Sequence, residues 1–264
     1  MVLEHIRHDF YQDGGPKERC WAYGWMVVRG ILDCYDLGKK TGDLKGSVAA
    51  EWLQGIRRTL RWYYKTMTPN GFCPAYGDGD LMKSDEIFAA FKKYLPASET
   101  NKPYEFSALI KPSGFAVMRD NETVGSRYLN LNFGESGGGH THGDLLDFNI
   151  WAFGEPMIEE VGRFDTYDHP LNPFFKSPEA HNQIVLDSLS MDRHSSEGQD
   201  IRWHSLPELD YFSGWHDAFR APGVLWPLHM EKIARIHRHV LFVRNAYWLF
   251  YDIVEPIDGS ADSA

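Results

Sequence analysis

The chain has only 3 cysteines and no long apolar run, and each shortage excludes a class of protein. Cys20, Cys34 and Cys73 lack the spacing of a metal finger, and their odd number cannot close a framework of disulfide pairs. No apolar stretch approaches the roughly 20 residues that a membrane-spanning helix requires. The N-terminal residues also lack the basic, apolar and small-residue order of a signal peptide, so they give no direct prediction of the compartment.

Basic residues are scarce as well. The 27 Lys and Arg face 37 Asp and Glu, which gives a formal net charge of −10. This balance argues against nucleic acid or an acidic membrane as a partner, because both bind through positive charge. An anionic sugar needs only a locally positive groove, to which Arg119, Arg163 and Lys176 could contribute. The aromatic content of 14% fits carbohydrate handling as well as core packing.

The first hundred residues have the pattern of helices. Large apolar residues recur at steps of three and four, which predicts helices over about residues 16–40, 47–67 and 84–94. After Pro96 the pattern changes to short β-type segments bounded by turns. Strands are predicted over residues 114–119, 127–133, 145–153, 157–161, 181–186, 232–244 and 247–254.

Helices followed by strands indicate an α+β chain in two parts, with a break at about residues 96–112. The last residues, 258–264, look like a turn without a returning strand. Together with the short helical part, this turn suggests a fragment of a longer protein.

Residues 134–162 contain the most site-like stretch of the chain. Three consecutive glycines lead into His140-Thr-His142, and an apolar run then leads to Glu159-Glu160. Glycines allow close approach of the backbone to a ligand. In an extended segment both histidine rings could face one cavity, although surface or structural histidines also occur in such pairs.

Several segments, in this order and spacing, resemble the heparinase II/III-like family of polysaccharide lyases. The matching segments are residues 112–119, 138–142, 148–156, 160–162, 180–182, 238–244 and 247–252. The resemblance implies a bacterial, multidomain α+β protein. Residues 1–100 would be the closing end of an (α/α) toroid, and residues 101–264 an antiparallel β-sandwich that is incomplete at its C-terminus.

Lyases of this family cleave uronic-acid-containing polysaccharides by β-elimination, which requires removal of the C5 proton and protonation of the leaving O4. The resemblance gives Tyr23, at the end of the segment 18–23, the role of catalytic acid, with the role of base also open to it. It gives His140 the role of base or carboxylate partner. The alternative for Tyr23 is a core residue, since Trp21 and Trp25 flank it. The family's carboxylate-neutralising residue lies upstream of the tyrosine segment, and no residue here is assigned to it.

The resemblance also implies a structural zinc ion (Zn2+) held by His142, Glu160 and His181. These residue types suit zinc, although the family has Asp where this chain has Glu160. Asp144 and Asp147 could orient His142 as hydrogen-bond acceptors. The alternative for His181 is that it satisfies backbone groups at the start of a strand.

The sequence therefore predicts a polysaccharide lyase acting on an anionic poly- or oligosaccharide, inactive if the fragment lacks a wall of the site. Two alternatives stay open: a uronyl C5-epimerase, and a non-catalytic carbohydrate-binding or zinc-stabilised module. The family implies a periplasmic or secreted protein, with a cytoplasmic oligosaccharide-specific enzyme as the other choice. The oligomeric state is open, a homodimer included.

Overall fold

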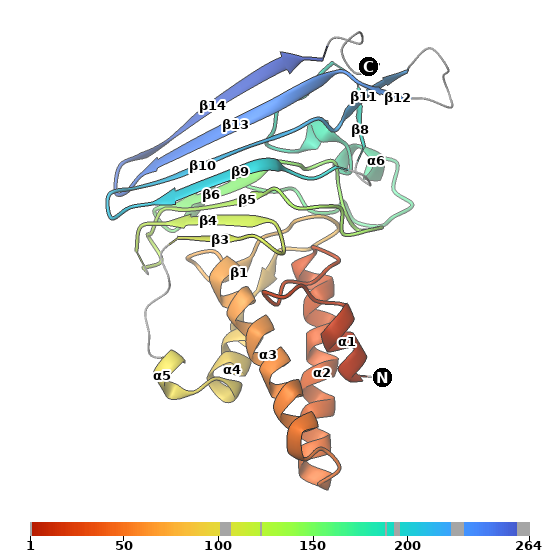
Figure 1. Ribbon diagram of the computed structural model, residues 1–264, viewed down its shortest axis with the longest axis vertical. Coiled ribbons are helices and arrows are strands. Elements are labelled where there is room, and N and C mark those ends of the chain that lie inside the picture. Colours follow the sequence, from red (N-terminus) through yellow and green to blue (C-terminus); the bar gives the residue numbers. More distant parts are fainter. Residues whose placement is uncertain are drawn as a thin grey trace.

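The computed structural model describes residues 2–100, 107–121, 123–187, 189–192, 196–222 and 230–257. Figure 1 shows a helical part below and two stacked β-sheets above it, with the N-terminus beside the helices. Among the described helices, none combines the length and the apolar character that crossing a bilayer demands.

The helical part contains α1 (Val2–His8), α2 (Trp21–Thr41), α3 (Gly46–Thr66), α4 (Asp85–Tyr94) and α5 (Ala97–Thr100). Both long helices form because apolar residues recur at helical spacing, which gives each one buried face. α2 ends at Gly42, whose φ of 78° is a left-handed conformation that glycine adopts without strain. A small hairpin of β1 (Phe72–Cys73) and β2 (Met82–Lys83) stands between α3 and α4.

The first large sheet is antiparallel, in the order β3-β4-β5-β6-β7. Its strands are β3 (Ala108–Ile110), β4 (Phe115–Arg119), β5 (Tyr128–Asn132), β6 (Phe148–Ala152) and β7 (Glu155–Ile158). Every residue of the three central strands is buried, because the helical part covers one face and the second sheet covers the other. Because both faces are buried, β4 and β6 lack a regular polar alternation, while β5 buries Asn130 and Asn132 beside its leucines.

The second large sheet has the order β14-β13-β10-β9 and packs on the first. It consists of β9 (Gln199–Ser205), β10 (Leu209–His216), β13 (Ala234–Val243) and β14 (Tyr247–Pro256). Alternate residues of β13 are buried, as expected for a strand with one face on the core. A smaller sheet joins β8 (Ser190–Met191), β11 (Phe219–Pro222) and β12 (Met230–Lys232), and α6 (Asn172–Phe175) and a 3-10 turn, η1 (Pro178–Ala180), precede it.

A buried arginine fastens the helical part to the first sheet. Arg19, just before α2, is 4% exposed and donates hydrogen bonds to the Ser113 carbonyl and to Asn132 Oδ1. Its guanidinium carbon lies 4.5 Å from the centre of the Phe115 ring. A Cβ on Gly134 would lie 1.9 Å from Arg19 Nη1, so only glycine leaves room for the guanidinium.

The predicted α+β fold, a helical toroid part followed by an antiparallel β-sandwich, is confirmed. The strand predicted over residues 181–186 is wrong. There Asn182 bonds through its side chain to the carbonyls of Phe148 and Glu159, which holds the segment as an irregular loop. β9 and β10 were not predicted, because their polar residues obscure the strand pattern. The predicted turn over residues 258–264 lies outside the described residues.

Candidate active site and metal centre

The glycine-rich loop runs closely along the helical part. A Cβ on Gly137 would lie 2.4 Å from the Glu18 carbonyl oxygen, so this backbone approach requires glycine. The loop is held internally by the Gly137 N–H, which donates to Thr141 Oγ1 over 2.6 Å. Because Glu18 comes shortly before Tyr23, the contact brings the histidine loop beside the start of α2.

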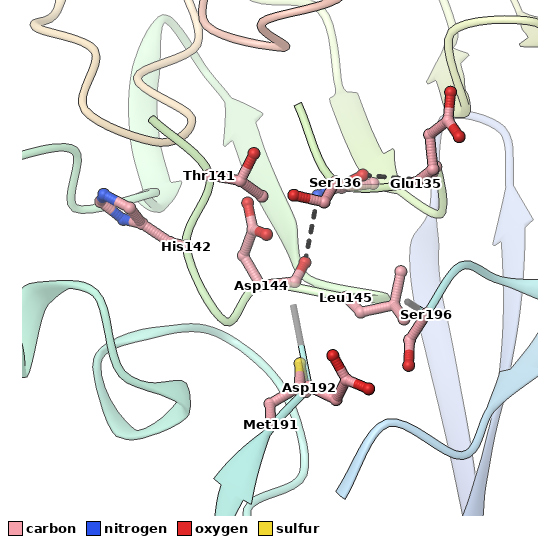
Figure 2. A pocket seen from close by; sticks show the side chains of 11 residues that line it. Glu135, Ser136, Thr141, His142, Asp144, Leu145, Met191, Asp192 and Ser196 are labelled. Carbon is pink, nitrogen blue, oxygen red and sulfur yellow. Dashed lines mark hydrogen bonds between the residues drawn. The ribbon is translucent and has the colours of Figure 1, made fainter. Parts of the chain in front are cut away.

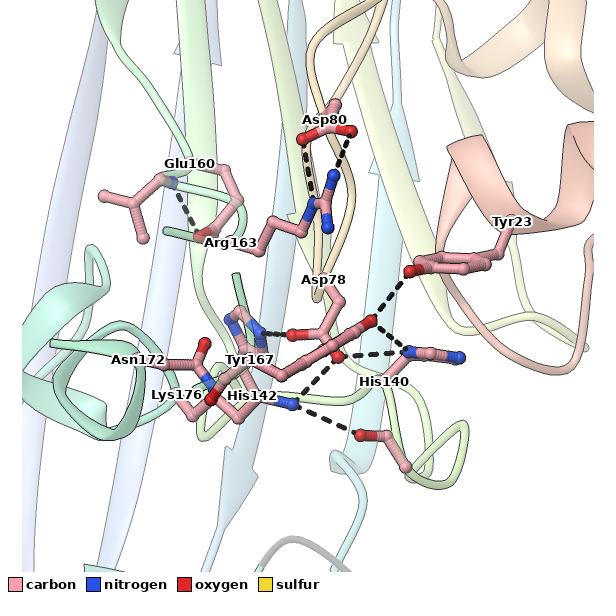
Figure 3. A network of polar contacts seen from close by, with 12 residues as sticks. Tyr23, Asp78, Asp80, His140, His142, Glu160, Arg163, Tyr167, Asn172 and Lys176 are labelled. Atoms are coloured by element: carbon pink, nitrogen blue, oxygen red, sulfur yellow. Dashed lines mark hydrogen bonds and ion pairs between the residues drawn. The ribbon is translucent and has the colours of Figure 1, made fainter. Parts of the chain in front are cut away.

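The structure brings Tyr23 and His140 together, as Figure 3 shows. Their rings are stacked, with centroids 4.1 Å apart and planes inclined by 15°. The Tyr23 hydroxyl lies 2.7 Å from the hydroxyl of Tyr167, which in turn lies 3.4 Å from His140 Nδ1. The His140 side chain is 30% exposed and so remains accessible to a ligand. The sequence analysis did not identify Tyr167, which comes from the loop before α6.

Asp78 is a second residue that sequence analysis missed. It lies in the loop between β1 and β2, with a fully buried side chain, and contacts both histidines of the His-Thr-His segment. Its Oδ2 is 3.0 Å from His140 Nδ1, and its Oδ1 is 3.0 Å from His142 Nε2. Lys176 Nζ adds an ion pair at 2.8 Å. Burial opposes ionisation, but the hydrogen bonds from His142, Lys176 and His140 prevail and lower the Asp78 pKa.

Two of the three basic residues considered from the sequence lie at this site. Lys176 contacts Asp78, and Arg163 pairs with Asp80 over 3.0 Å in the same loop. Arg119 is instead buried elsewhere, where it donates to the Met67 carbonyl and packs on the Tyr128 ring. It therefore stabilises the interior and adds no charge to the site.

His142, Glu160 and His181 form a compact buried cluster, their ligand atoms within 4.8 Å of one another. His181 Nδ1 is 2.8 Å from Glu160 Oε1. Among the described residues, the buried atoms His142 Nδ1, Glu160 Oε2 and His181 Nε2 have no hydrogen-bond partner. Imidazole nitrogen and carboxylate oxygen are both ligand atoms for zinc, so the three residues fit a metal ion.

The buried carboxyl group of Glu160 lies in surroundings that disfavour its negative charge. Burial raises the pKa of its carboxyl to about 7. Burial, followed by the charge of Glu160, also raises the pKa of Asp147 well above its usual value. Asp147 Oδ1 accepts a hydrogen bond from the Asn182 N–H over 2.7 Å. His142 is thus hydrogen-bonded to Asp78, and Asp147 lies beside Glu160 instead. A bound cation would favour the ionised forms of Asp147 and Glu160.

A small cavity lies on the other side of the loop, beside Asp144 and Thr141 (Figure 2). Its free volume of about 10 Å³ holds no more than a water molecule. This cavity is therefore too small for a larger ligand, whereas the His140 side chain is partly exposed.

The fold matches that of solved heparinase structures. A heparan sulfate lyase, HepC from Pedobacter heparinus, superposes with a TM-score of 0.79 and 17% identity over 96% of this chain and 40% of its own. A heparinase III gene product with methylated lysines gives a TM-score of 0.80 and 17% identity over 97% and 40%. A further heparinase III structure gives 0.74 and 15% over 97% and 42%.

This chain thus spans about 40% of the length of those proteins. No curated protein sequence matches it significantly. Two sequence profiles cover almost all of it: the one described as Heparinase II/III N-terminus matches residues 1–106, and Heparinase II/III-like, C-terminal, matches residues 105–261. The chain belongs to the heparinase II/III-like family.

Proposed function

We propose that this chain carries catalytic residues of a polysaccharide lyase that cleaves uronic-acid-containing poly- or oligosaccharides by β-elimination. The observation that carries the proposal is the stacking of Tyr23 on His140 at 4.1 Å. One residue comes from the helical part and the other from the sandwich part, yet both present proton-transferring groups at one exposed position. Membership of the heparinase II/III-like family supports the same reaction class.

In the proposed reaction, Tyr23 and His140 handle the two protons of the elimination. A base removes the proton at C5 of the uronate, and an acid protonates O4 as the glycosidic bond breaks. The Tyr23 hydroxyl supplies the acid, and His140 acts as the base. If His140 instead holds the uronate carboxylate, ionised Tyr23 is also the base: it removes the C5 proton and then delivers a proton to O4. A positioned proton-transfer group contributes about 10²- to 10⁴-fold in rate.

Two cationic side chains beside the histidine loop, each paired with an aspartate, support an anionic substrate. Lys176 and Arg163 lie beside the histidine loop although the chain carries a formal net charge of −10. A uronate that enters beside Tyr167 would meet these cations and compete with Asp78 and Asp80 for them. Cations that exchange an aspartate for the uronate would offset part of the repulsion expected from the acidic chain as a whole.

We also propose that His142, Glu160 and His181 hold a zinc ion with a structural role. Bound there, zinc would supply fixed positive charge and satisfy three buried atoms that have no hydrogen-bond partner among the described residues. The cluster contains His142, two residues after His140, so a metal bound there would hold the histidine loop in place. Tyr23 and His140 would then act on the sugar.

The test is incubation with glycosaminoglycan, alginate and ulvan oligosaccharides while the absorbance of the unsaturated uronyl product is followed. We expect an absorbance rise that Tyr23→Phe and His140→Ala abolish without unfolding the protein. No product across the whole panel contradicts the lyase assignment. Inverted uronate without chain scission would identify the epimerase instead, and binding that Tyr23→Phe leaves unchanged would identify a non-catalytic module.

A further inference from the structure

The Asp78 carboxylate is shared by two histidines that have different proposed tasks. It meets His140 through Nδ1 and His142 through Nε2, each over 3.0 Å. The two rings thus present opposite nitrogens to the same acidic group, as Figure 3 shows. The Lys176 ammonium group lies 2.8 Å from Asp78 Oδ2 and places a positive charge beside the carboxylate.

An ionised carboxylate only accepts hydrogen bonds, whereas a neutral imidazole has one N–H and one lone pair. The ring nitrogen that faces Asp78 must therefore carry the proton. For His140 this is Nδ1, which leaves a lone pair on Nε2. For His142 it is Nε2, which leaves a lone pair on Nδ1.

The two free lone pairs point to different places. His142 Nδ1 is one of the buried atoms without a hydrogen-bond partner in the described structure, and it belongs to the cluster with Glu160 and His181. His140 belongs to the partly exposed pair with Tyr23. We propose that Asp78 is a positioning residue that fixes opposite tautomers of the two histidines, so that His140 offers Nε2 to the sugar and His142 offers Nδ1 to a metal. The two tasks named here rest on the proposed function, but the tautomers follow from the contacts of neutral rings with an ionised Asp78.

The backbone supports this role, because the Asp78 loop is joined to the histidine loop independently of the carboxylate. The Asp78 N–H donates to the His140 carbonyl over 3.0 Å. Gly77 has a φ of +61°, and a Cβ there would lie 2.4 Å from the same oxygen. Removal of the carboxylate alone should therefore leave the two loops together.

The experiment is long-range proton–nitrogen NMR of protein labelled with ¹⁵N-histidine, at about pH 8 where exposed rings are neutral. His140→Gln and His142→Gln variants assign the two signals. We expect the Nδ1–H form for His140 and the Nε2–H form for His142. The opposite tautomer at either ring in the wild-type protein overturns the proposal.

Asp78→Asn sharpens the test, because an amide has one oxygen and one NH₂ where the carboxylate has two acceptors. The ring that meets the NH₂ must accept a hydrogen bond, so at least one of the two histidines should change tautomer. The matched control is Asp80→Asn in the same loop, which should leave both tautomers as they are. Unchanged tautomers in a folded Asp78→Asn protein contradict the proposal; if that variant does not fold, the wild-type spectrum decides.

Activity gives a separate readout. If the wild-type protein is a lyase, Asp78→Asn should lower kcat about 10- to 100-fold, the usual effect of losing such a supporting hydrogen bond, with a smaller change in KM. An inactive wild-type protein would refute the proposed function but not the tautomer assignment. A lyase whose kcat is unaffected by Asp78→Asn would refute the positioning role.

Discussion

Replacing Arg19 with leucine should destabilise the protein by about 3 kcal/mol. The change leaves two buried acceptors, the Ser113 carbonyl and Asn132 Oδ1, without their donor, and each such loss costs about 1–3 kcal/mol. Loss of the cation–π contact with Phe115 adds about 1 kcal/mol. Leucine recovers part of this sum, because burial disfavours the guanidinium charge and lowers the pKa of Arg19.

The assay is urea unfolding followed by tryptophan fluorescence, with Arg29→Leu as the matched control on α2. Arg29 is 61% exposed and lies 3.5 Å from Glu86, so its loss should cost less than about 1 kcal/mol. Gly134→Ala should destabilise like Arg19→Leu, because the new Cβ would occupy the place of the guanidinium. In Arg19→Leu the clash is absent, so the double variant should be more stable than the sum of the single changes predicts. A free energy of unfolding for Arg19→Leu within about 0.5 kcal/mol of the wild type would refute the reasoning.

Three further predictions concern the site and the sandwich. Tyr23→Phe should lower kcat by about 10²- to 10⁴-fold in the absorbance assay, while Tyr167→Phe, which keeps the ring, should have a smaller effect; equal activity of Tyr23→Phe and wild type contradicts the acid role. Elemental analysis after dialysis against a weak chelator should find one zinc per chain, and less in Glu160→Gln; absence of zinc from the wild type rejects the metal assignment. Burial, with the charge of Arg238, lowers the pKa of His216 to about 3, so the unfolded chain binds a proton that the folded chain excludes. Stability should therefore fall as the pH drops from about 6.5 towards 3, by about 2 kcal/mol at pH 5, and His216→Gln should lose this part of the pH dependence in urea titrations.

Local sequence patterns predicted most of the fold because the long helices repeat apolar residues at regular steps, and β4, β5 and β6 are short segments rich in apolar residues. The pattern failed where local hydrogen bonding decided the conformation. Arg19, with a φ of 56°, lies in the turn that delays the predicted first helix until Trp21. The loop at Asn182 is likewise held by side-chain contacts that no periodicity reveals.

The candidate site shows the same limit. Resemblance to the family pointed to Tyr23 and His140, and the structure brings them into contact. Asp78 could not be identified this way, since its contacts with the histidines span 62 and 64 residues of sequence. The sequence feature that could have drawn attention to Asp78 is the preceding Gly77. Glycine permits the positive φ there and the close approach to the His140 carbonyl.

The contact that fastens the two parts of the chain should also set the geometry of the proposed catalytic pair, Tyr23 and His140. Arg19 shortly precedes Tyr23, and Gly134, which makes room for its guanidinium, shortly precedes His140. Each anchor is thus joined by a short piece of chain to one member of the stacked pair. Displacement of the guanidinium should separate Tyr23 from His140 before the protein unfolds. Gly134→Ala should therefore reduce kcat at urea concentrations where the tryptophan fluorescence is still that of the native protein, and full activity there would show that the pair is positioned independently of Arg19.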